Sequence, residues 1–171
     1  CLSCCLRSGV PPQLWRYTGL RNKCLTNVDR LISPSAYTAR RHADAGITRP
    51  IEILPMFSGL EGVAQSAPEQ AFMPEPYFLY VGRVTASKGL QSLVQTFAAA
   101  PDLRLLVVGD GDLRASLMQE YAACPNISFR GAMPQAKLVD VYARARALIL
   151  PSLAPETFGL TVIEAAENAV P

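Results

Sequence analysis

Four short apolar segments recur between residues 77 and 171, and helical patterns fill the intervals between them. The apolar segments are Tyr77–Val81, Leu103–Val108, Ile127–Phe129 and Ala147–Leu150. The amphipathic patterns predict helices at residues 89–99, 112–123 and 135–144. Near-continuous apolar strands that alternate with helices are typical of a parallel sheet covered on both faces. The sequence therefore predicts an α/β domain that binds its ligands beyond the carboxyl ends of the strands.

The last apolar segment leads into a loop and then into another helical pattern. Pro151 and Ser152 end the strand, and helical spacing of apolar residues resumes at Leu160, with Thr161 as a candidate cap. Gly159 lies where loop and helix join, and it has no side chain to hold a ligand away from the backbone. Because a helix start exposes unpaired N–H groups and a partial positive charge, this join is a predicted phosphate site.

Charged residues of both signs lie near this predicted phosphate site. Glu156 precedes the helix and Glu164 lies within it, and carboxylates at such places accept hydrogen bonds from sugar hydroxyls. The alternative is a solvated loop residue at 156 and a favourable charge in a first helical turn at 164. Arg83 and Lys88 are the only charges of the loop 82–89, which should open at the same edge of the sheet. A guanidinium fork and an ammonium group suit a diphosphate, although two solvated bases on a turn would give the same pattern.

The end of the second predicted strand has two features that resemble ligand motifs. Gly109-x-Gly111 resembles the start of a dinucleotide fingerprint, but Arg114 stands where the last glycine should be. Asp110 and Asp112 resemble a carboxylate pair that holds a divalent metal. Their setting between a strand and a helix instead favours a turn, with Asp112 near the helix N-cap. We therefore predict no metal site here.

Composition and charge exclude several classes of function. The formal net charge is +2 and no Lys/Arg-rich run occurs, so nucleic-acid binding is not expected. No apolar run approaches the roughly 18 residues that span a bilayer, and no signal peptide is visible. Among the five cysteines, Cys1, Cys4 and Cys5 form a cluster. A closed four-ligand metal site would also need Cys24, the only histidine, His42, or residues upstream of this sequence. We expect thiols in a reducing, cytoplasmic compartment rather than a metal centre.

The N-terminal part shows the same succession of strands and helices on a smaller scale. Helical spacing at residues 12–30 precedes a short strand at Leu31-Ile32, a helix at 36–45 capped by Ser35, and a second strand at Ile51–Leu54. The first of these strands closes with Pro-Ser, as does the last strand of the C-terminal part. Both parts are therefore expected to be α/β.

A change of composition separates these two parts. Residues 55–76 are dominated by Pro, Gly, Ser, Gln and Glu without any period, which predicts an interdomain linker. The predicted division is residues 1–54, the linker 55–76 and a second α/β domain at 77–171. Because the chain begins with a cysteine and ends directly after a helix, we expect both domains to be incomplete.

Several segments taken together resemble one family. In chain order they are Gly82-Arg83 with Lys88-Gly89, the strand end Val107–Gly111, Phe129-x-Gly131, Pro151-Ser152, Glu156-x-Phe158-Gly159-Leu160 and Glu164-Ala165. This set resembles the group-1 (family 4) glycosyltransferases of GT-B fold, which have two Rossmann-like domains. Residues 31–57 resemble the end of that family's N-terminal domain, and residues 77–171 resemble most of its donor-binding domain, a Rossmann-like parallel sheet flanked by helices.

The resemblance implies a retaining transfer of a sugar from a nucleotide-diphosphate sugar to an acceptor, without a metal or other cofactor. It implies that Arg83 and Lys88 stabilise the diphosphate leaving group and that Glu156 touches the donor sugar. Donor binding is implied for six further residues: Gly82, Met133, Phe158, Gly159, Leu160 and Glu164. Within this second group, the resemblance implies that Glu164 binds the ribose hydroxyls and that Met133 lines the base site.

The resemblance also implies partners and a place in the cell. We expect a sugar or lipid-linked acceptor, a role in polysaccharide or glycolipid synthesis, and peripheral contact with the inner face of the plasma membrane through the N-terminal domain. The pair Glu167-Asn168 departs from the family, which usually has a glycine here, although asparagine tolerates a left-handed helix end. The fragment itself is expected to be inactive. The alternatives are a non-catalytic nucleotide-binding α/β module and a GT-B-like sugar-nucleotide epimerase.

Overall fold

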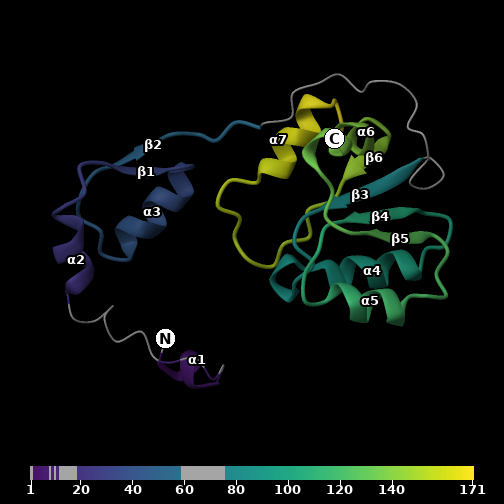
Figure 1. Ribbon diagram of the computed structural model, residues 1–171, viewed down its shortest axis with the longest axis horizontal. Coiled ribbons are helices and arrows are strands. Elements are labelled where there is room, and N and C mark those ends of the chain that lie inside the picture. The colour runs from purple at the N-terminus through teal and green to yellow at the C-terminus, as the bar shows by residue number, and fades with distance from the viewer. Residues whose placement is uncertain (1, 8, 10, 12–18, 59–75) are drawn as a thin grey trace. The chain divides into compact units, whose positions relative to one another are not determined.

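The computed structural model describes residues 2–7, 9, 11, 19–58 and 76–171, and its chain divides into two compact units (Figure 1). The units are Cys1–Pro55 and Met56–Pro171. The predicted linker, 55–76, starts at this division, but residues 59–75 lie outside the described part. The predicted domain limits therefore stay predictions.

The second unit is built around a four-stranded parallel sheet in the order β5-β4-β3-β6. The strands are β3 (Tyr77–Val81), β4 (Leu105–Val108), β5 (Ile127–Arg130) and β6 (Ala145–Leu148). In the register, Leu79 lies beside Leu106 of β4 and Leu148 of β6. The predicted α/β class with a parallel sheet is confirmed.

Strand β6 begins two residues earlier than the predicted Ala147, and it ends at Leu148 rather than Leu150. The prediction followed the apolar run, which marks strands buried on both faces. Here β6 is the edge strand of the described sheet, and Arg146 within it is exposed. The Arg146 guanidinium lies over the Phe78 ring, 5.6 Å from its centroid, so a charged residue occupies a strand position that the apolar pattern excluded.

Helices cover both faces of this sheet, as Figure 1 shows with α4 and α5 on one side and α6 and α7 on the other. Their bounds are α4 (Leu90–Ala98), α5 (Arg114–Glu120), α6 (Gln135–Ala143) and α7 (Leu160–Glu167). Tyr80 of β3 packs with the side chains of α4 and α5, whereas its neighbours Leu79 and Val81 pack with those of α6 and α7. This alternation follows from the two-residue period of a strand.

The strand order creates a crevice at one place on the sheet edge. After β3 the chain adds β4 and then β5 on one side, and it returns to place β6 on the other side of β3. The connections that leave β3 and β6 therefore diverge at the carboxyl ends of these two neighbours. In open α/β sheets, ligands bind at such a reversal of strand order.

The first unit contains a small β-α-β arrangement in which β1 and β2 pair in parallel. Its elements are α1 (Leu2–Arg7), α2 (Leu20–Leu25), β1 (Leu31–Ser33), α3 (Ala36–Asp44) and β2 (Ile51–Ile53). The predicted cap is confirmed, because the Thr38 backbone N–H donates to the Ser35 hydroxyl over 3.2 Å. None of the described helices is long and apolar enough to cross a bilayer.

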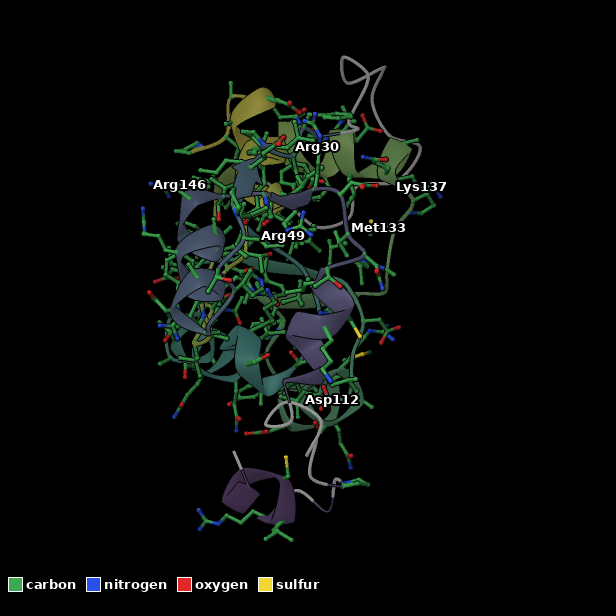
Figure 2. All side chains as sticks on the ribbon, turned by 90° about the vertical axis from the view of Figure 1, so that its left-hand side faces the viewer. Arg30, Arg49, Asp112, Met133, Lys137 and Arg146 are labelled. Atoms are coloured by element: carbon green, nitrogen blue, oxygen red, sulfur yellow. The ribbon has the colours of Figure 1, made fainter. Side chains whose placement is uncertain are left out.

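The helix predicted at residues 12–30 is only partly seen, since 12–18 lie outside the described residues and α2 ends at Leu25. The segment after α2 is held by Arg49, whose guanidinium donates to the carbonyls of Leu25, Val28 and Asp29 (Figure 2). These contacts come from a side chain 20 or more positions away in the sequence, which the local spacing of apolar residues could not indicate.

Candidate functional site

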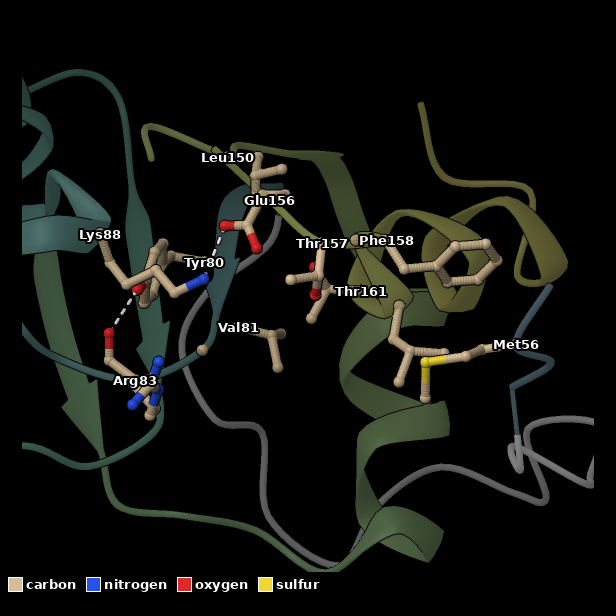
Figure 3. A pocket seen from close by; sticks show the side chains of 13 residues that line it. Met56, Tyr80, Val81, Arg83, Lys88, Leu150, Glu156, Thr157, Phe158 and Thr161 are labelled. Carbon is tan, nitrogen blue, oxygen red and sulfur yellow. Dashed lines mark hydrogen bonds and ion pairs between the residues drawn. The ribbon is translucent and has the colours of Figure 1, made fainter. Parts of the chain in front are cut away.

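A pocket of about 270 Å³ lies where the loops after β3 and β6 meet, at the reversal of strand order (Figure 3). It is lined by Met56, Tyr80, Val81, Gly82, Arg83, Lys88, Leu150, Glu156, Thr157, Phe158, Gly159, Leu160 and Thr161. Seven of the nine residues predicted for the site are in this lining: Gly82, Arg83, Lys88, Glu156, Phe158, Gly159 and Leu160. Residues far apart in the sequence therefore converge on one cavity, as the carboxyl-end rule predicted.

The two loops that form the pocket are bonded to each other through a short 3₁₀ turn, Ala86–Lys88. The Ser87 carbonyl accepts hydrogen bonds from the backbone N–H groups of Leu153 and Ala154, at 3.0 and 3.1 Å. Gly89 ends this turn with a left-handed backbone, φ 68°, and a Cβ there would lie 2.1 Å from the Pro151 carbonyl oxygen. Only glycine permits both the conformation and this close approach. The approach brings the lysine of one loop to the glutamate of the other.

Lys88 and Glu156 form an ion pair across the junction, with 2.6 Å between Nζ and Oε1. The Ser152 hydroxyl donates to the same carboxylate oxygen. Hydrogen bonds from Lys88 and Ser152 lower the pKa of the Glu156 carboxyl, while partial burial opposes them. Glu156 is therefore ionised at neutral pH and held inside the pocket, so the alternative of a freely solvated loop carboxylate is wrong.

The start of α7 forms another wall of the pocket. Gly159 is its N-cap in a left-handed conformation, φ 81° and ψ 52°, and no side chain caps the helix. The prediction of Thr161 as the cap is wrong. Thr161 is the second residue of the helix, whereas a capping side chain belongs to the residue just before the first helical residue. The first N–H groups of a helix lack partners one turn back, and here they belong to residues that line the pocket.

The balance of charge in the pocket favours an anion. Arg83 and Lys88 contribute two positive charges and Glu156 one negative charge, and the amino end of α7 adds a partial positive charge. Arg83 is exposed, whereas Lys88 and Glu156 are partly buried, with only 21% and 26% of their side-chain area exposed. A cavity with fixed positive charge and a carboxylate at its wall suits a phosphate that carries a hydroxylated group.

Glu164 and Met133 do not line this pocket. The Glu164 carboxylate accepts a hydrogen bond of 2.8 Å from the buried Tyr142 hydroxyl of α6. It lies in the second turn of α7, so the alternative of a charge in the first helical turn is wrong. Met133, which Figure 2 labels, precedes α6. Like Leu138 of that helix, it packs against the core cluster that contains Tyr142. Glu164 and Met133 are thus placed by contacts with α6 or with its core rather than by the pocket lining.

The Asp110–Asp112 segment adopts a turn between β4 and α5. The Gly111 backbone N–H donates to the Asp110 carboxylate over 2.8 Å, and the Arg114 guanidinium lies 3.9 Å from the same carboxylate. Asp112 lies next to the N-cap of α5, as predicted, but the N-cap itself is Leu113 and no side-chain hydrogen bond caps the helix. In the described part of the chain, no three His, Cys, Asp or Glu residues gather in a way that could hold a metal ion.

Of the cysteine cluster, Cys1 lies outside the described residues, and Cys5 is a half-buried free thiol. Cys24 is a second free thiol and is exposed to solvent. The described thiols form no disulfide, which agrees with the expected state of the cysteines without testing the compartment.

Comparison with known families shows to which family the chain belongs. The sequence profile of the family described as "Glycosyl transferases group 1" matches residues 64–171. The chain belongs to the group 1 glycosyltransferases. A curated relative, the sulfoquinovosyl transferase SQD2 of Arabidopsis thaliana, is 30% identical over 97 residues, which are 57% of this chain and 19% of the relative.

A second curated relative of this group 1 glycosyltransferase is the GDP-mannose-dependent monoacylated alpha-(1-6)-phosphatidylinositol monomannoside mannosyltransferase of Corynebacterium glutamicum. It is 28% identical over 167 residues, 85% of this chain and 44% of the relative. Among solved structures, sucrose-phosphate synthase from Thermosynechococcus elongatus superposes with a TM-score of 0.72 at 26% identity, covering 96% of this chain and 46% of that one. The chain thus spans less than half the length of these relatives.

The lipopolysaccharide glycosyltransferase WaaG has the same fold, with a TM-score of 0.63 at 19% identity over 83% of this chain and 43% of that one. The predicted GT-B class and the predicted family are therefore confirmed. An epimerase was the alternative, and the family match does not favour it.

Three residues of this glycosyltransferase that hold the site in place were missed by the sequence reasoning. In the sequence, Tyr80 belongs to an apolar strand pattern, Ser152 follows the end of a strand and Tyr142 belongs to a helical pattern. In the structure, the hydroxyl of each donates to a predicted site residue: to the Arg83 carbonyl, to Glu156 and to Glu164, respectively. A tyrosine counts as apolar in a periodicity, so its hydroxyl left no signal in the pattern.

Proposed function

We propose that the full-length protein is a retaining glycosyltransferase that moves a sugar from a nucleotide-diphosphate sugar to an acceptor. The observation that carries the proposal is the convergence of Arg83, Lys88 and the amino end of α7 on one pocket at the reversal of strand order. Membership of the group 1 glycosyltransferases supports it. In this proposal the pocket receives the diphosphate of the donor.

The two cations act on the leaving group. As the bond between sugar and phosphate breaks, negative charge builds on the diphosphate, and fixed positive charge stabilises the transition state more than the ground state. Lys88 is held by Glu156 at 2.6 Å, so its ammonium group is already oriented before a donor arrives. Arg83 presents a planar fork that can hold two phosphate oxygens at once.

The remaining pocket residues act on the sugar. Glu156 keeps its charge beside Lys88, and only one of its oxygens is engaged by Lys88 and Ser152, so the other can accept from a donor hydroxyl. Phe158, Gly159 and Leu160 line the pocket at the start of α7, and in this proposal their backbone binds the diphosphate and the sugar. Gly82 also lines the pocket, where an added Cβ would lie 3.1 Å from the Tyr80 hydroxyl oxygen.

The nucleoside end of the donor extends beyond the pocket in this proposal. Glu164 takes the ribose hydroxyls with the carboxylate oxygen that Tyr142 leaves free, and Met133 lines the base. The orientation of the carboxylate by a buried phenol supports the role, because a fixed acceptor loses little entropy when it binds a ribose.

The acceptor is proposed to be a sugar or a lipid-linked sugar, in polysaccharide or glycolipid synthesis. The names of two relatives support this: one transfers mannose to a monoacylated phosphatidylinositol mannoside and the other is a sulfoquinovosyl transferase. Work on a lipid-linked acceptor would take place in the cytoplasm, with peripheral contact at the inner face of the plasma membrane. No metal is required in this proposal, since the cations of the pocket neutralise the diphosphate.

The proposal is tested by assaying the full-length protein with a panel of nucleotide-diphosphate sugars and sugar or lipid-linked acceptors. We expect transfer with the anomeric configuration of the donor preserved in the first-formed product, as read by NMR, and a rate nearly unchanged by excess EDTA. Inversion would contradict the retaining mechanism. Loss of activity with EDTA, copied by Asp112→Asn, would show that the Asp110–Asp112 turn holds a metal.

Replacement of Glu164 tests the ribose contact separately from the chemistry. In the full-length protein, Glu164→Ala should weaken the nucleotide and the nucleotide-sugar alike, by about 1–3 kcal/mol for a lost charged hydrogen-bond partner. Calorimetry measures both affinities, and Glu120→Ala, an exposed glutamate at the end of α5, is the matched control. Unchanged affinities in a folded Glu164→Ala protein would remove this role.

A further inference from the structure

Strand β3 carries a tyrosine, Tyr80, whose hydroxyl contacts the backbone of the loop that contains Arg83. Tyr80 is 1% exposed, lines the pocket and donates from its hydroxyl to the Arg83 carbonyl over 2.7 Å (Figure 3). Its ring packs in the core face formed with α4 and α5, so the phenol is anchored at the ring end. A rigid group therefore touches the backbone of a residue whose side chain is exposed.

The backbone around Arg83 is fixed at several points, and the phenol is one of them. The Gly82 N–H donates to the Val108 carbonyl over 3.0 Å, and the Val84 N–H donates to the Asp110 carbonyl over 2.9 Å. The Arg83 carbonyl accepts from Tyr80 and also from the Thr85 N–H, at 2.7 and 3.1 Å. The Arg83 carbonyl and the Val84 N–H belong to one peptide unit, so the phenol and the Asp110 carbonyl hold that plane from its two edges.

The electrostatic setting keeps the hydroxyl a donor. Burial and the nearby Glu156 charge raise the pKa of Tyr80 to about 12, and Arg83 opposes this only in part. The phenol therefore keeps its proton throughout the neutral range. A carbonyl can accept from it but could not accept from a phenolate.

We propose that Tyr80 is a positioning residue for Arg83. Its hydroxyl holds the Arg83 backbone so that the guanidinium points toward the diphosphate of the donor. The inference rests on the proposed function of Arg83. The side chain of an exposed arginine has many rotamers, and the positions that its guanidinium can occupy depend on the position of its backbone. A backbone shift of about 1 Å far from the reacting atoms is enough to reduce a rate about 100-fold, so a hydroxyl that fixes the peptide plane contributes to turnover without touching the donor.

The test is Tyr80→Phe in the full-length protein, with Tyr77→Phe as the matched control. Tyr77 lies on the same strand, is also 1% exposed, and donates from its hydroxyl to the Val141 carbonyl over 2.8 Å on the opposite face of the sheet. Both variants lose one hydrogen bond from a tyrosine hydroxyl to a backbone carbonyl, so their melting temperatures should fall by similar amounts. Only Tyr80→Phe should lower kcat, about 10- to 100-fold, with a smaller change in the KM of the donor.

A double-mutant cycle with Arg83→Ala separates positioning from a general loss of structure. In the Arg83→Ala background, Tyr80→Phe should change kcat by less than about twofold, because there is no guanidinium left to position. Equal kcat losses with and without Arg83, or a kcat of Tyr80→Phe equal to that of Tyr77→Phe, would overturn the inference while leaving the proposed function intact. Wild-type turnover in the Arg83→Ala single variant would overturn both the inference and the proposed function, and this measurement does not depend on the Tyr80 variants.

Discussion

Arg83→Ala in the full-length protein should lower the turnover of sugar transfer about 100- to 1,000-fold, or about 2.7–4 kcal/mol, the usual effect of removing one preorganised charge partner of a transition state. In the proposed role, the guanidinium acts where negative charge develops on the diphosphate, so kcat should fall more than the affinity for the donor. Arg83→Lys should not restore the rate, because the planar fork is lost although the charge remains.

Lys88→Ala should have an effect of the same order, with a second consequence that Arg83→Ala lacks. The lysine also holds Glu156 through the 2.6 Å ion pair, so its removal leaves this carboxylate without its cation. The losses in the double variant should be less than additive, since both cations are proposed to act on one diphosphate. Lys88→Arg should retain more activity than Lys88→Ala, because a point charge makes weaker geometric demands.

Turnover is measured for both single variants and the double variant, and folding is checked by melting. Lys137→Ala is the matched control, since Lys137 is an exposed lysine on α6 of the same unit and does not line the pocket. Turnover within a few-fold of wild type in both single variants would exclude the diphosphate role. The protein would then be better explained as a non-catalytic nucleotide-binding module.

The α/β fold of the second unit could be predicted because its central strands are buried on both faces. Leu105–Val108 are all buried, and such a strand leaves a continuous apolar run in the sequence. The edge strand β6 was misplaced by two residues, since Arg146 interrupts its apolar run. The order of the strands does not follow from periodicity, because a helical connection of similar length can place the next strand on either side of β3.

Much of the pocket could be predicted because charged and glycine residues at the carboxyl ends of strands leave a clear sequence signal. Arg83, Lys88 and Glu156 stood out as charges in loops, and the structure brings all three to one cavity. The supporting hydroxyls of Tyr80 and Tyr142 could not be predicted, since they lie in apolar patterns and act across long separations in the chain. The close approach of two loops at one glycine is likewise a tertiary contact without a local pattern.

That close approach leads to the other large expected effect, in Gly89→Ala. The substitution adds a Cβ 2.1 Å from the Pro151 carbonyl oxygen and places alanine at φ 68°. A left-handed backbone costs a residue with a Cβ about 1–2 kcal/mol, and overpacking against fixed atoms costs about 1–3 kcal/mol. We therefore expect the free energy of unfolding of this unit to fall by about 2–5 kcal/mol.

Gly159→Ala is the control that separates conformation from contact. Its φ is 81°, but the nearest atom to an added Cβ, Cγ2 of Val162, lies at an ordinary 3.7 Å. Gly159→Ala should therefore lose only the conformational part, about 1–2 kcal/mol, in denaturant unfolding followed by circular dichroism. The larger loss in Gly89→Ala should be accompanied by lower turnover, because relief of the clash separates the loops whose contact brings Lys88 to Glu156. Equal losses of stability in the two variants would mean that the loops can separate freely, and the junction would not be what holds the ion pair together.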